Sequence, residues 1–197
     1  VYISKKEDPT INSRQIFLLI GLLLITQILK VNFKTISPLS IIVPPTLIIS
    51  QGISKITALS WVSIALINWP NSENGMNEYL LLITFISSCI VAILGEKIRS
   101  RAQLLQVSIF VPIGAFIGQY LLLGINNNDL YNFNIQNLIS KHGNIISDSF
   151  LLATLILLAI IFMPILESIF GLVTKARLLE LADQEKPLLR RLSIEAP

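Results

Sequence analysis

Charged residues divide the chain into six long uncharged stretches. The shortest has 15 residues and the longest 27, and the stretches are 15–29, 35–54, 56–72, 79–95, 102–128 and 149–166. A helix needs about 20 mostly apolar residues to cross roughly 30 Å of hydrocarbon, and five stretches reach the usual length directly. The first stretch is long enough if Lys30 extends its ammonium group to the interface. The pattern therefore predicts a polytopic integral membrane protein.

The same stretches favour helices over the strands of a membrane barrel. Barrel strands have about 10 residues that alternate apolar with polar, whereas residues 16–25 and 151–161 are apolar on every side. We expect an all-α bundle in which residues 15–173 form the transmembrane domain. The six expected spans are 15–33, 36–53, 55–70, 79–95, 104–124 and 149–171.

Composition supports a membrane protein and excludes several other classes. Apolar residues make up 53% of the chain and charged residues only 14%, against about 25% charged residues in soluble domains. This composition argues against a soluble globular protein, and more strongly against a disordered one. The single cysteine, Cys89, excludes a disulfide scaffold, and no Cys/His spacing for zinc is present. The net charge of +3 gives no reason to expect nucleic acid as a partner.

The basic residues predict how the chain is oriented. If residues 1–14 are cytoplasmic, 12 of the 15 Lys and Arg residues fall in cytoplasmic segments and three fall outside. Positive residues concentrate in cytoplasmic loops of membrane proteins. We therefore expect both ends of the chain in the cytoplasm, as an even number of spans requires.

Prolines and glycines mark irregular positions within the expected spans. Pro44 and Pro45 remove two backbone donors, so they predict a kink or a break in the second span. A discontinuous helix beside a binding site, as in transporters, is the alternative to a structural kink. Beside Pro112, the GxxxG pair of Gly114 and Gly118 predicts close helix packing, within the bundle rather than between two copies.

Glu167 is the carboxylate nearest to a membrane span, close to the end of the sixth helix. An ionisable group at membrane depth is a functional candidate by default. A structural salt bridge or hinge and a ligand- or proton-binding role both remain open. Pro164 and Gly171 flank it as helix breakers and predict a hinge there, which continues to Thr174.

The end of the chain has a different composition, with mixed charge and a leucine face. Thr174 is a candidate N-cap for a cytoplasmic linker helix over residues 174–197, and Pro187 interrupts that segment. The apolar face formed by Leu188, Leu189 and Leu192 would stay exposed at the end of the chain. We therefore expect a soluble cytoplasmic domain to follow, and the absence of an initial Met leads us to expect residues before Val1.

Three segments carry a resemblance to a known family. They are MPILESIFGLVT (163–174), LLELAD (178–183) and PLLRRLSIEAP (187–197). They resemble the junction of bacterial seven-transmembrane HD phosphohydrolases. The resemblance implies a plasma-membrane protein with an extracellular domain, seven helices and a cytoplasmic HD domain that uses divalent metals to hydrolyse c-di-AMP. Its metal ligands would lie beyond Pro197, so no residue of this chain is assigned to catalysis or to a metal.

Three functions follow as hypotheses. The first is a membrane anchor and signal-transmitting module of such an HD phosphohydrolase, with Pro164, Glu167, Gly171 and Thr174 as the coupling hinge. The second is a transporter or permease subunit, which draws on Pro44–Pro45 and on polar groups within the spans. The third is an anchor that senses nothing. The lipid bilayer and the protein's own HD and extracellular domains are the expected partners, and the sequence assigns neither a ligand nor an oligomeric state.

Overall fold

The computed structural model describes residues 13–32, 36–69, 78–98, 100–127, 143–172 and 174. These residues form six helices and no strand: α1 (Ser13–Asn32), α2 (Pro38–Gly52), α3 (Lys55–Ile67), α4 (Glu78–Lys97), α5 (Arg101–Asn127) and α7 (Gly143–Phe170). The expected all-α fold is confirmed for this part of the chain. Residues 1–12 and 175–197 lie outside it, and with them most of the expected N-terminal segment and linker helix.

Four of the helices, α1, α4, α5 and α7, are long and apolar enough to cross a membrane. Helices α2 and α3 are apolar but have only 15 and 13 residues, which correspond to about 22 and 20 Å of helix. That these two shorter helices also cross the membrane stays a prediction. The boundary between them is sharp because Ser54 caps α3, accepting a hydrogen bond from the backbone N–H of Thr57 at 3.2 Å.

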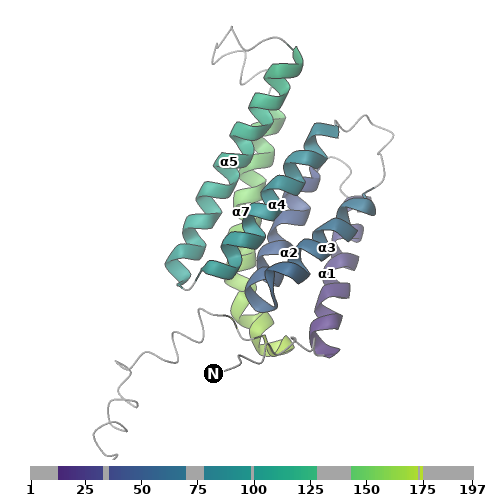
Figure 1. Ribbon diagram of the computed structural model, residues 1–197, viewed down its shortest axis with the longest axis vertical. Helices are drawn as coiled ribbons and strands as arrows, with labels where there is room; N and C mark the ends of the chain where they lie inside the picture. The colour runs from purple at the N-terminus through teal and green to yellow at the C-terminus, as the bar shows by residue number, and fades with distance from the viewer. Residues whose placement is uncertain are drawn as a thin grey trace, which may run out of the picture.

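Helix α2 lies at the centre of the bundle (Figure 1). It packs against α3, α4 and α7, whereas α1 lies at the edge, beside α2 and α3. Thirteen of the 15 residues of α2 are buried, and they contribute to all three apolar clusters of the core. Helix α2 therefore contacts α1, α3, α4 and α7 directly.

The two prolines of α2 do not end the helix. Pro44 and Pro45 both lie within α2, and Pro44 is buried. Directly after them, the hydroxyl of Thr46 shares a hydrogen bond with the carbonyl oxygens of Ile42 and Val43 in the preceding turn. Neighbouring helices and hydroxyl side chains commonly support proline inside membrane helices. The structure thus places both prolines in one continuous helix, and the alternative of a discontinuous helix is not observed.

The expected close packing at Gly114 and Gly118 is not found among the described residues. A Cβ atom built at Gly114 would meet no atom within 4 Å, and one at Gly118 would meet only Ile83, at 4.0 Å. The buried side of α5 is formed instead by Val111, Ala115 and Gln119, which recur every four residues. Gly114 lies about 100° around the helix from Ala115 and therefore faces outward. Pro112, next to Val111, is buried within α5.

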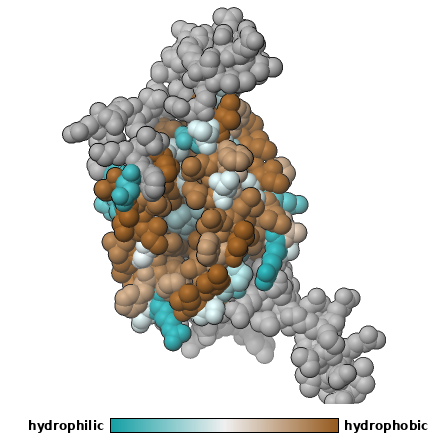
Figure 2. Space-filling model, turned by 180° about the vertical axis from the view of Figure 1, so that it is seen from behind, coloured by the Kyte–Doolittle hydropathy of each residue, from teal (hydrophilic) through white to brown (hydrophobic). Residues whose placement is uncertain are grey.

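The outer surface of the bundle is apolar. Large side chains such as Phe17, Phe110 and Ile161 are exposed, and Figure 2 shows apolar residues over most of the described surface on one face. Such a surface suits contact with lipid chains. We call one end of the bundle the junction end: α2, α4 and α7 finish there, and α1, α3 and α5 begin there (Figure 1). An ion pair between Lys55 and Glu96, 3.0 Å apart, joins α3 to α4 at this end.

Candidate coupling site at the end of the last helix

Helix α7 ends in a sharp turn at Gly171. The φ angle of Gly171 is +64°, a left-handed conformation that glycine adopts without the steric penalty other residues have. The turn directs the chain back toward the bundle, so that Leu172 is almost completely buried in the apolar cluster that contains α2 and α3. Leu172, which follows α7, is therefore packed against residues of α2 and α3.

The turn brings Glu167 and Thr174 together. The hydroxyl of Thr174 donates a hydrogen bond to the Oε1 atom of Glu167, seven residues earlier. Only 7% of Glu167 and 2% of Thr174 are exposed. Hydrogen bonds to a charged acceptor are stronger than those between neutral groups, and removing one partner from a buried pair is costly. The Glu167–Thr174 pair thus holds the start of the following segment against α7.

Leu172 fixes the same segment to α2. A Cβ atom at Gly52, the last residue of α2, would lie only 2.8 Å from Cδ1 of Leu172. Real Cβ atoms do not approach so closely, so the contact requires glycine at position 52 or a shift of Leu172. The end of α2 and the residues after α7 are therefore in direct van der Waals contact.

The end of α2 also fits tightly against α4. The side-chain amide of Gln51 donates a hydrogen bond to the carbonyl oxygen of Gly95. A Cβ atom at Gly95 would overlap Oγ of Ser50 and lie 3.0 Å from its Cβ. The last turn of α2 consequently touches α4 on one side and the segment after α7 on the other.

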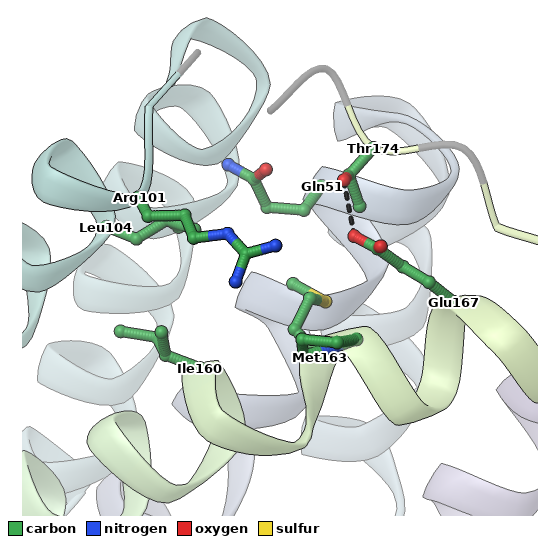
Figure 3. Close-up of a pocket in the computed structure, with 8 residues that line it drawn as sticks. Gln51, Arg101, Leu104, Ile160, Met163, Glu167 and Thr174 are labelled. Carbon is green, nitrogen blue, oxygen red and sulfur yellow. Dashed lines mark hydrogen bonds between the residues drawn. The ribbon is translucent and has the colours of Figure 1, made fainter. Parts of the chain in front are cut away.

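A small cavity separates these contacts from the start of α5. Its lining residues are Gln51, Arg101, Leu104, Ile160, Met163, Pro164, Glu167 and Thr174. Figure 3 shows the polar side chains of Gln51, Arg101 and Glu167 converging on it from α2, α5 and α7. Three helices and the segment after α7 therefore meet at one polar site.

The four residues expected to form a coupling hinge lie together in this region. Glu167 and Thr174 are hydrogen-bonded, Gly171 makes the turn, and Pro164 lines the cavity. The other candidates lie elsewhere: Pro44 and Pro45 in the middle of α2, and Pro112, Gly114 and Gly118 in α5.

Sequence reasoning missed the residues of the site that come from other helices. Gln51 and Arg101 are far from Glu167 in the sequence, so spacing alone does not connect them to it. The role of Leu172, which follows α7 itself, was also missed, because its residue type is ordinary. One available signal was a polar amide at the very end of an apolar stretch, followed directly by Gly52.

The comparisons with known proteins identify the family of the chain. The family model described as a 7TM receptor with intracellular HD hydrolase matches residues 1–174, which end at Thr174 of the pair. Cyclic-di-AMP phosphodiesterase PgpH of Listeria monocytogenes serotype 1/2a (strain 10403S) is 24% identical over 207 positions. The alignment covers all of this chain and 28% of the length of that relative. None of the solved structures gives a significant match. The chain belongs to the family of 7TM receptors with an intracellular HD hydrolase.

Proposed function

We propose that this chain is the membrane module of a bacterial HD-domain phosphohydrolase that hydrolyses c-di-AMP, and that it transmits an external signal to the HD domain. Membership of the family and the name of the relative from Listeria support this proposal. The distribution of 12 basic residues against three supports a plasma-membrane orientation with both ends of the chain in the cytoplasm. The junction end would then face the HD domain, whose divalent metals would perform the hydrolysis.

The observation that carries the proposal is the connection between Thr174 and the bundle. Segments before and after the turn at Gly171 are joined by the Glu167–Thr174 hydrogen bond, and Leu172 is packed on Gly52. A passive tether needs none of these contacts. A module that transmits movement does need them, because a shift of α7 or α2 must displace the chain that leads to the enzyme.

The mechanism we propose is a shift between two arrangements of this junction. In the arrangement described here, the Glu167–Thr174 pair is intact and Leu172 is buried. A signal that moves α7 relative to α2 would favour a second arrangement in which the pair is separated. A ligand can shift such an equilibrium only by its difference in affinity for the two states. The Gly171 turn would absorb the change in backbone direction.

Substitution of Thr174 by Val in the full-length protein tests this role. The change keeps the shape of the side chain and removes the hydroxyl donor, so it separates the pair without creating a cavity. We expect c-di-AMP hydrolysis in proteoliposomes to change by at least about fivefold, as expected for typical coupling energies. Thr154→Val is the matched control, since Thr154 lies on α7 away from the junction, is exposed and bonds only to the carbonyl of Leu151 among the described residues.

The two variants also separate signalling from anchoring. If both insert normally and both hydrolyse c-di-AMP at the rate of the unmodified protein, the junction transmits nothing and the module is a passive anchor. A change in both variants would point to a general disturbance of α7 instead.

A further inference from the structure

The cavity at the junction end has a size that restricts what it can hold. Its volume is about 30 Å³, whereas pockets for small organic ligands are usually about 300–1,000 Å³. A buried water molecule needs roughly 10–15 Å³ of such space together with two to four polar partners. The cavity therefore has room for water and no room for a nucleotide or a lipid headgroup.

The walls of the cavity provide the polar partners. Gln51, Glu167 and Thr174 are each more than nine-tenths buried, and Arg101 reaches the same space from the start of α5. Leu104, Ile160 and Met163 form the apolar remainder. Because the walls carry donor groups as well as carboxylate and amide oxygens, they suit a molecule that both donates and accepts hydrogen bonds.

The charges around the cavity also favour a neutral occupant. The guanidinium group of Arg101 and the carboxylate of Glu167 both face the space. A cation would be attracted by the carboxylate but repelled by the guanidinium group, and for an anion the two effects are reversed, so neither kind of ion gains a net attraction from the pair. Water is neutral and can orient its dipole between the two groups, so it can hydrogen-bond to both in addition to their other contacts.

We propose that this cavity is a water-binding site whose ordered water connects Arg101 of α5 and Gln51 of α2 to the Glu167–Thr174 pair. Through this water, α2 and α5 contact the residues that lead out of the bundle, in addition to the direct packing of Leu172. The site stands on the cavity and its polar walls, and it does not depend on the proposed signalling role.

Methionine oxidation by X-ray radiolysis tests the site directly, because Met163 lines the cavity. Radiolysis converts water into hydroxyl radicals, which oxidise a nearby methionine to its sulfoxide. The full-length protein in lipid nanodiscs is irradiated, and oxidation of Met163 is measured by mass spectrometry. Only 4% of Met163 is exposed, so rapid oxidation would come from water held in the cavity.

A second methionine in a dry part of the same helix gives the reference rate. Leu152→Met introduces it within the apolar core cluster, and exchanges of Leu for Met are usually well tolerated. We expect Met163 to be oxidised severalfold faster than the reference residue. Equal rates at the two positions would show that the cavity is dry and would overturn the proposal.

Filling the cavity is the complementary test. Ile160→Phe places a larger side chain at the cavity wall, and we expect the oxidation of Met163 to fall to the reference rate. Ile161→Phe is the matched control, because Ile161 is exposed on the outside of α7 and should leave the rate unchanged. If a folded Ile160→Phe variant retained rapid oxidation, the radicals would come from another source and the site would be excluded.

Discussion

Helices α1 and α2 have a similar apolar character and opposite environments. α1 buries only Leu18 and Thr26 among its 20 residues, whereas α2 buries 13 of 15. Hydropathy does not distinguish them, because lipid chains are about as apolar as a packed protein core. The difference lies in the small and polar residues of α2, its serines, threonine and Gln51, which allow close packing and hydrogen bonds between membrane helices.

Helix α1 is held at a few points along its length. The indole N–H of Trp61 donates to the carbonyl oxygen of Leu19 at 3.1 Å. At the end of α1, Lys30 donates to the carbonyl oxygen of Asn68 at 3.3 Å and lies 5.2 Å from the ring centre of Trp69. Such contacts fix a peripheral helix to α3 and to the two residues after α3 without burying the peripheral helix. We therefore expect substitutions in α1 to cost little and substitutions in α2 to cost much.

The largest difference should appear on truncating one leucine in each helix. Leu47 of α2 is completely buried, whereas 58% of Leu24 in α1 is exposed. Leu47→Ala should reduce the free energy of unfolding by roughly 2–5 kcal/mol, because it leaves a cavity among packed helices. Leu24→Ala should change it by less than about 0.5 kcal/mol, because lipid replaces the lost contacts. Unfolding by denaturant in detergent micelles measures both values, and equal losses would show that α1 is packed as tightly as α2.

A smaller difference should separate two glycines. Gly95 faces Ser50 of α2 so closely that any Cβ atom would overlap it, whereas Gly21 of α1 has no atom within 4 Å of such a position. Gly95→Ala should therefore cost about 1–3 kcal/mol through overpacking. Gly21→Ala should cost nothing and can stabilise the helix by up to about 1 kcal/mol. The midpoint temperature of unfolding measures both changes, and a tolerated Gly95→Ala would mean that Ser50 moves away without cost.

The same contrast explains how much of the fold followed from the sequence. Uncharged stretches located the six helices of the described part of the chain, because a membrane excludes charge from a helix far more strongly than a protein interior selects residue types. The predicted first and last residues of the helices were less accurate than the predicted number of helices. α7 begins at Gly143, ahead of the expected residue 149, because a helix can continue past a charged residue such as Asp148. The sequence did not predict which side of each helix is buried, since the outer and inner sides of these helices are both apolar.

The site was predictable only where it is local in the sequence. Pro164, Glu167, Gly171 and Thr174 lie within 11 residues, so their composition alone indicated a junction. Gln51 and Arg101 join them through the packing of α2, α5 and α7. This packing cannot be predicted from the spacing of the residues in the sequence. The same limit applies to Gly114 and Gly118, where a known packing motif was assigned to the interior of the bundle although Gly114 faces outward.

The smallest expected effect concerns that outward-facing glycine. Gly114→Ala adds a methyl group where no described atom lies within 4 Å, so the free energy of unfolding should change by no more than about 0.5 kcal/mol. The variant and the unmodified protein should also have the same molecular mass by light scattering in detergent. A clear loss of stability would contradict the assignment of Gly114 to a lipid-facing surface. It would place a second copy or another helix on that side of α5, where apolar residues and a small-residue pair are already suited to close packing.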